Sequence, residues 1–190
     1  FGFFKNKQQN KNMYLLVGLG NIGKKYEQTR HNFGFLTLDS IIYEHNLAKS
    51  SAKFESEVFT GSIDDNKVVA IKPQTFMNSS GISVQAASSF YKIPPENIIV
   101  FHDEIDIKLG EIRIKQGGGH AGHNGLKSID SRIGKNYWRF RLGISRPPSA
   151  EYEVSDYVLS KFSKNEFLTV DEINHDISAK LSTFLIEKKL

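Results

Sequence analysis

Short apolar runs alternate along this chain with longer segments in which apolar residues return every third or fourth position. The short runs are rich in Val, Ile and Phe and are bounded by glycine and polar residues, which is the pattern of buried strands. The longer segments have the period of an amphipathic helix. The pattern predicts strands over residues 13–19, 54–63, 67–72, 98–102, 111–115 and 138–144, and helices over residues 31–45, 78–91, 122–133 and 164–188.

The order of these elements predicts the class of fold. Strands alternate with helices from residue 13 onward, without a long linker, an internal repeat or a block of like charge, so we predict one α/β domain. The last predicted helix has the clearest periodicity, because its apolar residues share one face. These residues are Val170, Ile173, Ile177, Leu181 and Phe184.

The composition of the chain excludes several classes of protein and several kinds of catalytic chemistry. The chain has 190 residues, enough for one domain with a sizeable core. It contains no cysteine, which excludes disulfides, thiolate nucleophiles and cysteine-ligated zinc and favours a reducing compartment. No apolar run approaches the roughly 20 residues that a membrane helix needs. Residues 1–12 are polar and lack the features of a secretory signal, so we interpret them as a disordered or added extension before Met13.

The first predicted strand is followed by Gly18, Gly20 and Gly23, which have the G-x-G-x-x-G spacing of a dinucleotide-binding loop. That loop requires a helix to start at the third glycine and an acidic residue to end the next strand, about 20 residues on. Here polar residues without helical period follow Gly23, and the acidic residues at that distance fall inside a predicted helix. We therefore predict a tight loop that lets the backbone and Asn21 approach a substrate closely.

Polar side chains gather after the predicted strands, where open α/β sheets place their chemistry. Read singly, each has an ordinary structural explanation, because asparagine caps helices and glycine-rich loops connect elements. Together they suit the hydrolysis of an activated ester: neutral His31 takes a proton from water, Asp103 fixes the histidine tautomer, and asparagine amides stabilise a developing oxyanion. The polar residues concerned are Asn21, His31, Asn78, Asp103, His120, His123 and Asn124.

The motifs of bacterial-type peptidyl-tRNA hydrolases are matched, in order and spacing, by VGLGNIGKKYEQTRHNFGF, KPQTFMNSSG, VFHDEID and GGGHAGHNGLKSI. The chain resembles this family from residue 13 to its end. The resemblance implies a single α/β domain, usually monomeric, with a twisted mixed central sheet and helices on both faces. It also implies hydrolysis of the ester between a peptide's C-terminus and the 3′ ribose of tRNA, which frees tRNA for reuse, with no metal or organic cofactor.

The resemblance further implies roles for individual residues. His31 matches the catalytic base, and Asp103 matches the carboxylate paired with it. The asparagines that hold the substrate and its reacting carbonyl are matched by Asn21, Asn78 and Asn124, of which Asn21 and Asn78 are counted with the catalytic residues. Other positions in the cleft are matched by Tyr26, Met77, Gly122 and His123, and phosphate-binding cations by Lys115 and Arg141.

The charge of the chain agrees with a tRNA substrate. Lys and Arg outnumber Asp and Glu by 25 to 21. Residues two apart in a strand share a face, so we expect Arg113 with Lys115, and Arg139 with Arg141, to present paired cations to phosphates. Ordinary solvated strand faces are the alternative. Ala121 stands where the family usually has glycine, which stiffens the loop without removing a catalytic group.

The residues leave two other functions open. Asp103, Glu104 and Asp106, together with a nearby histidine, form a cluster of the kind that holds divalent ions, which would suit a metal-dependent hydrolase that chelation inactivates. The basic strands would also suit an RNA-binding module without catalysis, whose binding survives His31→Ala. The preferred interpretation is a cytoplasmic, monomeric peptidyl-tRNA hydrolase with no cofactor and no membrane partner.

Overall fold

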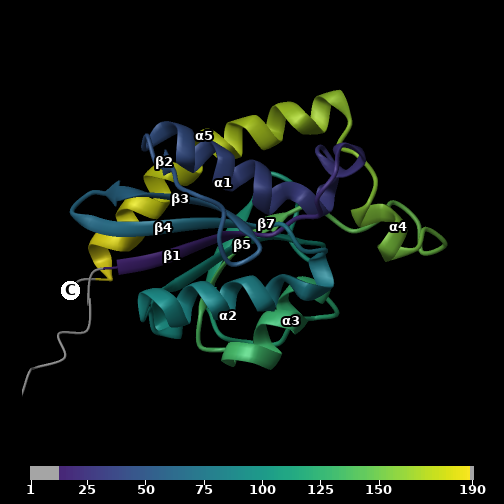
Figure 1. The fold of residues 1–190 in the computed structure, drawn as a ribbon. Helices are drawn as coiled ribbons and strands as arrows, with labels where there is room; N and C mark the ends of the chain where they lie inside the picture. Colours follow the sequence, from purple (N-terminus) through teal and green to yellow (C-terminus); the bar gives the residue numbers. More distant parts are fainter. Residues whose placement is uncertain (1–12, 189–190) are drawn as a thin grey trace, which may run out of the picture.

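The computed structural model describes residues 13–188, which form a twisted central sheet with helices on both faces (Figure 1). Within these residues the sheet has seven strands in the order β2-β3-β4-β1-β5-β7-β6. The α/β fold with a mixed sheet is therefore confirmed. The strands are β1 (Met13–Gly18), β2 (Ala48–Lys49), β3 (Ser56–Ile63), β4 (Asn66–Pro73), β5 (Ile98–Glu104), β6 (Ile112–Gln116) and β7 (Trp138–Gly143).

Strand direction decides where the polar side chains meet. Strands β4, β1, β5 and β7 are parallel neighbours, whereas β3 runs antiparallel to β4, and β6 runs antiparallel to β7. The parallel strands therefore all end at one edge of the sheet. The segments that follow β1 and β4 leave from this edge and carry Asn21, His31 and Asn78, and β5 ends there with Asp103. The glycine-rich loop (residues 117–123) instead follows β6, which is antiparallel to β7 and ends at the opposite edge.

Helices α1 and α5 cover one face of the sheet, and α2 and α3 cover the other (Figure 1). The short helix α4 lies beyond the carboxyl edge, beside the turn η2. No helix within residues 13–188 combines the length and the hydropathy needed to cross a membrane. The helices are α1 (Phe33–Glu44), α2 (Ser80–Tyr91), α3 (Asn124–Ile133), α4 (Val154–Val158) and α5 (Lys164–Glu187), with 3₁₀ turns η1 (Lys24–Tyr26), η2 (Arg30–Asn32), η3 (Met77–Ser79) and η4 (Pro95–Asn97).

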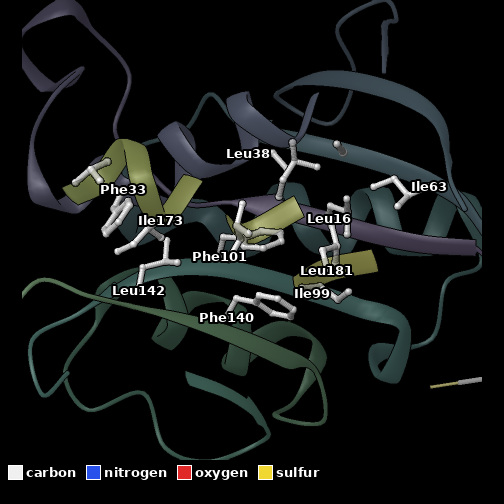
Figure 2. Close-up of a cluster of buried hydrophobic side chains, with 14 of the residues drawn as sticks. Leu16, Phe33, Leu38, Ile63, Ile99, Phe101, Phe140, Leu142, Ile173 and Leu181 are labelled. Atoms are coloured by element: carbon white, nitrogen blue, oxygen red, sulfur yellow. The ribbon is translucent and has the colours of Figure 1, made fainter. Parts of the chain in front are cut away.

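Each face of the sheet has its own hydrophobic core, and β5 contributes to both. Ile99 and Phe101 belong to the core under α1 and α5, whereas Ile98 and Val100 belong to the core under α2 and α3. Burial on both faces explains why this strand is an unbroken apolar run. Figure 2 shows the first core, in which the ring centroids of Phe101 and Phe140 are 5.0 Å apart.

Gly34, in α1, and Gly20, in the loop after β1, allow this helix to lie close to the sheet and the loop. A Cβ atom on Gly34 would lie 2.2 Å from the carbonyl oxygen of Phe101, and one on Gly20 would lie 2.5 Å from the ring of Phe35. Both contacts are too short for any larger residue. Because α1 begins only at Phe33, the third glycine of the G-x-G-x-x-G pattern, Gly23, does not begin the helix that a dinucleotide site requires. Gly18 and Gly20 of this pattern lie against α1, whereas Gly23 has a φ of 108°, which favours glycine in the loop.

The structure differs from the sequence prediction in a few places. Strand β5 extends through Asp103, which was expected to follow the strand, and His31 lies in η2, directly before α1. Strand β2 and helix α4 were not predicted, because both are very short and mostly exposed. The extension expected over residues 1–12 lies outside the described residues.

Candidate active site

Asp103 lies at the carboxyl end of β5 and joins two histidines. Its carboxylate is 2.9 Å from Nδ1 of His31 and 2.9 Å from Nε2 of His123. The two histidine ring centroids are 4.9 Å apart. Asp103 is only 3% exposed. Because water hardly screens its charge, the carboxylate interacts strongly with both histidine rings. We call His31, Asp103 and His123 the histidine–aspartate cluster.

Hydrogen-bond partners determine which nitrogen of each ring carries the proton. Nδ1 of His123 accepts a bond from the backbone N–H of Leu126, because His123 is the N-cap of α3. The proton of a neutral His123 therefore sits on Nε2, which donates to Asp103. His31 donates from Nδ1 to the same carboxylate. Its Nε2 is left with a lone pair that is able to accept a proton.

The charges of the cluster perturb the pKa values of its members. Burial lowers the pKa of His31, but the charge of Asp103 and the hydrogen bond to it outweigh burial, so the pKa is raised overall. Burial raises the pKa of Asp103, but the charges of His31 and His123 and their hydrogen bonds hold it well below its usual range. Asp103 is therefore ionised at neutral pH and stabilises a positive charge on His31.

A pocket of about 180 Å³ opens beside the cluster. It is walled by the end of β5, the glycine-rich loop and α4, which are distant in the sequence. His31 thus faces a space that a small part of a substrate is able to enter. The lining residues are His31, Asp103, Glu104, Ile105, His120, Ala121, Gly122, His123, Asn124, Val154, Ser155 and Val158.

Asn21 is held in the loop after β1 by a residue that the sequence analysis did not single out. The side chain of Asn32 accepts a bond from the backbone N–H of Asn21 at 2.8 Å and donates to its carbonyl oxygen at 3.0 Å. The Oδ1 atom of Asn21 accepts from the backbone N–H of Met77 at 2.8 Å. This leaves the NH₂ group of Asn21 as a donor at a neighbouring pocket of about 480 Å³.

Asn78, in η3 directly before α2, and Asn124, the first residue of α3, lie at a further pocket between these two helices. Both are exposed, and they line a pocket of about 390 Å³ together with Lys127 and Arg132. We call this the asparagine groove. Because Asn124 also lines the pocket at the histidine–aspartate cluster, the two spaces are adjacent. Half-buried Tyr26, in η1, lines none of the three pockets described within residues 13–188.

The predicted phosphate-binding cations share one face of β6 and β7. Arg113 is paired with Arg141 across the strands, and Lys115 is paired with Arg139. Arg113 and Lys115 are exposed, and half-buried Arg141 forms an ion pair with Glu104 at 3.4 Å. The expectation that Arg139 presents its charge to phosphates is wrong, because it is only 2% exposed. The glycine-rich loop folds over it and accepts its hydrogen bonds.

The carboxylates proposed as an alternative metal site do not converge. Glu104 accepts from Arg141, and Asp106 accepts from Arg146 at 2.9 Å. Within the described residues, the side chains with metal-ligand atoms in reach of one another are His31, Asp103 and His123. Both histidines already donate to Asp103, so the geometry favours a proton-transfer site over a site built from Asp103, Glu104 and Asp106.

Arg30 is a second residue that sequence reasoning missed. It precedes His31 and donates to both carboxylate oxygens of Glu166 at 2.9 Å and to the carbonyl oxygen of Lys161 at 2.9 Å. The charge of Arg30 also lies over the ring of Tyr157 in α4. Arg30 therefore joins the turn that carries His31 to α4 and to the start of α5. A buried arginine gives no periodic signal in a sequence.

Comparisons with known proteins agree with the geometry. The sequence profile described as peptidyl-tRNA hydrolase matches residues 15–190. A peptidyl-tRNA hydrolase of Anaplasma marginale is 48% identical over 173 residues, with 91% of each chain covered. One of Rickettsia bellii is 45% identical over 179 residues, which cover 94% of this chain and 96% of the relative. The crystal structure of peptidyl-tRNA hydrolase from Acinetobacter baumannii matches with a TM-score of 0.87 at 41% identity, covering 94% of this chain and 90% of that one. By its sequence and its fold, the chain belongs to the peptidyl-tRNA hydrolase family.

Proposed function

We propose that this enzyme hydrolyses the ester between the peptide C-terminus and the 3′ ribose of peptidyl-tRNA, with His31 as the general base. Nε2 of His31 takes a proton from a water molecule while the water oxygen attacks the ester carbonyl carbon. When the tetrahedral intermediate collapses, the imidazolium returns that proton to the 3′ oxygen of the ribose, which leaves. The products are a peptide acid and free tRNA.

The observation that carries this proposal is the 2.9 Å contact between Asp103 and Nδ1 of His31 beside an open pocket. An ionised carboxylate in this position orients the imidazole, fixes its tautomer and stabilises the positive charge that forms during proton transfer. His123 donates to the same carboxylate and so fixes the carboxylate in turn. Membership of the family supports the same assignment.

The asparagines are proposed to act on the substrate and not on the proton. The NH₂ groups of Asn21, at the pocket of about 480 Å³, and of Asn78, in the asparagine groove, are uncharged donors suited to an oxygen that becomes negative in the transition state. Asn124, which borders both the pocket and the asparagine groove, is proposed to hold the substrate. Gly122 and His123, which line the pocket at His31, are proposed to contact the substrate. Tyr26 and buried Met77 line none of the three pockets, and the proposal that they contact the substrate rests on the pattern of the family.

The tRNA backbone is proposed to bind the face of β6 and β7. Exposed Lys115 and Arg113 offer charge to phosphates, and Arg141 contributes while paired with Glu104. Such contacts position a nucleic acid without reading its bases. We further propose a cytoplasmic monomer that needs no cofactor.

The test is the release of free tRNA from a purified peptidyl-tRNA, measured with and without EDTA. We expect release that EDTA leaves unchanged. An analogue in which an amide replaces the ester should bind but resist cleavage, which separates binding from chemistry. Loss of release with EDTA would favour a metal-dependent hydrolase. Binding of peptidyl-tRNA without any release would favour an RNA-binding module.

A further inference from the structure

Arg139 is a buried cation that the proposed chemistry does not use. It lies on β7 directly across from Lys115 on β6. Its guanidinium donates to the carbonyl oxygens of Gly119 at 2.7 Å and Gly118 at 3.0 Å, and to Oδ1 of Asp130 at 3.1 Å. A guanidinium engaged by three protein acceptors is committed to the protein, in contrast to the exposed Lys115 beside it.

The backbone of the glycine-rich loop is shaped for this contact. Gly117 and Gly118 have φ values of 69° and 100°, in the left-handed region that residues with a Cβ atom rarely adopt. With this backbone, two successive carbonyl groups, of Gly118 and Gly119, reach one guanidinium. Arg139 therefore holds the backbone of the loop in place just before His120 and His123.

Arg139 also holds the helix that follows the loop. Asp130 belongs to α3, and besides Arg139 it accepts a hydrogen bond from the hydroxyl of Tyr137 at 2.7 Å. His123 is the N-cap of the same helix. One side chain thus fixes the segment before His123 and the segment after it.

The chain between these two fixed segments is a compact turn. The backbone N–H of His123 donates to the carbonyl oxygen of His120 at 2.8 Å. The backbone N–H of Gly122 donates to Nδ1 of His120 at 3.0 Å. His123 then reaches Asp103 at 2.9 Å. A shift of the loop at Gly119 would therefore move His123 relative to the carboxylate.

The geometry points to Arg139 as a positioning residue for the hydrolysis: it holds the loop and α3 so that His123 meets Asp103. This inference rests on the proposed function, because it requires the Asp103 carboxylate to orient the base. Arg139 acts through His123 and touches no substrate. Its loss should therefore impair every ester substrate, whether or not the substrate carries phosphates.

The experiment compares Arg139→Lys with Lys115→Ala on two substrates, peptidyl-tRNA and an N-acetylaminoacyl ester of adenosine that has no phosphate. Lysine keeps the charge but cannot reach two carbonyl groups and a carboxylate at once. We expect kcat of Arg139→Lys to fall about 10- to 100-fold on both substrates, the scale of a small misplacement of a catalytic group. Lys115→Ala should raise KM for peptidyl-tRNA and leave the adenosine ester unaffected.

Tyr137→Phe and Asp130→Asn separate positioning from stability. Tyr137→Phe removes a hydrogen bond from the same buried network but leaves the guanidinium contacts in place, so it should lower the unfolding temperature with kcat near native. Asp130→Asn should lower kcat on both substrates in the same direction as Arg139→Lys. In both kcat-impaired variants, the ¹⁵N chemical shifts of the His123 ring should show the loss of its bond to Asp103.

Native kcat on the adenosine ester in Arg139→Lys or in Asp130→Asn would overturn the inference. So would an effect confined to KM for peptidyl-tRNA, which would return Arg139 to phosphate binding, or an equal loss of kcat in Tyr137→Phe, which would indicate a purely structural role. If the native enzyme releases no tRNA, the proposed function fails instead, and the two failures are thus distinguishable.

Discussion

The histidine–aspartate cluster and the asparagine groove are neighbours that differ in burial and in hydrogen bonding. In the cluster, His31 and Asp103 are at most 9% exposed, and Nδ1 of His31 and the Asp103 carboxylate already have protein partners. In the groove, Asn78 and Asn124 are exposed, and neither side chain forms a hydrogen bond within residues 13–188. The residues proposed to transfer a proton are thus held in place by the protein, whereas the side chains proposed to bind the substrate have hydrogen-bonding groups without a protein partner.

This difference suits the roles proposed for the two regions, proton transfer in the cluster and substrate binding in the groove. A base must have the correct tautomer and pKa at all times, and both depend on a buried neighbour of fixed charge. A donor for a developing oxyanion is useful only if its hydrogen bond is not already made to the protein. The contrast predicts that changes in the cluster affect the pH profile and kcat, whereas changes in the groove and on the cationic face affect substrate geometry or affinity.

The largest effect is expected for His31→Ala. Removing the base should lower kcat on peptidyl-tRNA by on the order of 10⁴-fold, the upper end for a general base. The fold should persist, because Asp103 keeps its bond to His123. Circular dichroism checks the fold, and tRNA release checks the rate. A folded variant with near-native turnover would remove His31 from the mechanism.

Asp103→Asn should lower kcat by about 10³-fold, because an amide neither stabilises the imidazolium nor enforces the tautomer. It should also move the pH profile. Activity requires deprotonated His31 and therefore rises as pH increases through the pKa of His31, which Asp103 raises. Without that charge the pKa falls, so the acidic limb of the kcat profile should shift to lower pH. An unshifted limb would mean that His31 is not the group that titrates.

Asn78→Ala should cost about 10²-fold in kcat if its amide meets the oxyanion. Asn78→Asp should be worse than alanine, because a carboxylate repels the developing negative charge. The acidic limb of the pH profile should be the same in native and alanine enzymes, since asparagine does not titrate. An active Asn78→Asp enzyme would indicate that this residue only shapes the start of α2.

Smaller effects are expected on the cationic face. Lys115→Ala and Arg141→Ala should each weaken peptidyl-tRNA binding by roughly 1–3 kcal/mol. Lys115 should show the cleaner effect, because Arg141→Ala also leaves Glu104 without its partner. The measurement is KM at several salt concentrations, where each lost phosphate contact should reduce the salt dependence. Equal losses on a phosphate-free ester would contradict the phosphate role.

The sequence predicted the fold and much of the cluster for physical reasons. Apolar periodicity locates strands, and parallel strands bring their ends to one edge, so His31 and Asp103 were expected to be close. The same argument does not predict which side-chain atoms form hydrogen bonds with one another. That His123 shares the carboxylate depends on a turn in the glycine-rich loop, whose backbone conformation is set by tertiary contacts.

Buried polar residues were the least predictable part. Arg139 follows the strand alternation that suggested an exposed cation, and only the loop folded over it makes it a buried one. Asn32 resembles any helix-capping asparagine until its two bonds to Asn21 are seen. The alternation of apolar and polar residues predicts which face of a strand a residue lies on, but it does not predict whether another segment of the chain covers that face.

The contact between Arg30 and Glu166 joins residues 136 positions apart, which matters for the order in which the protein is synthesised. A ribosome makes the turn that carries His31 early, and the start of α5 much later. While it is being made, the nascent chain is itself a peptidyl-tRNA. Since Arg30 gains its carboxylate partner only after α5 begins to emerge, the ion pair that joins the turn of His31 to Glu166 forms only after the strands and helices before α5 have been made.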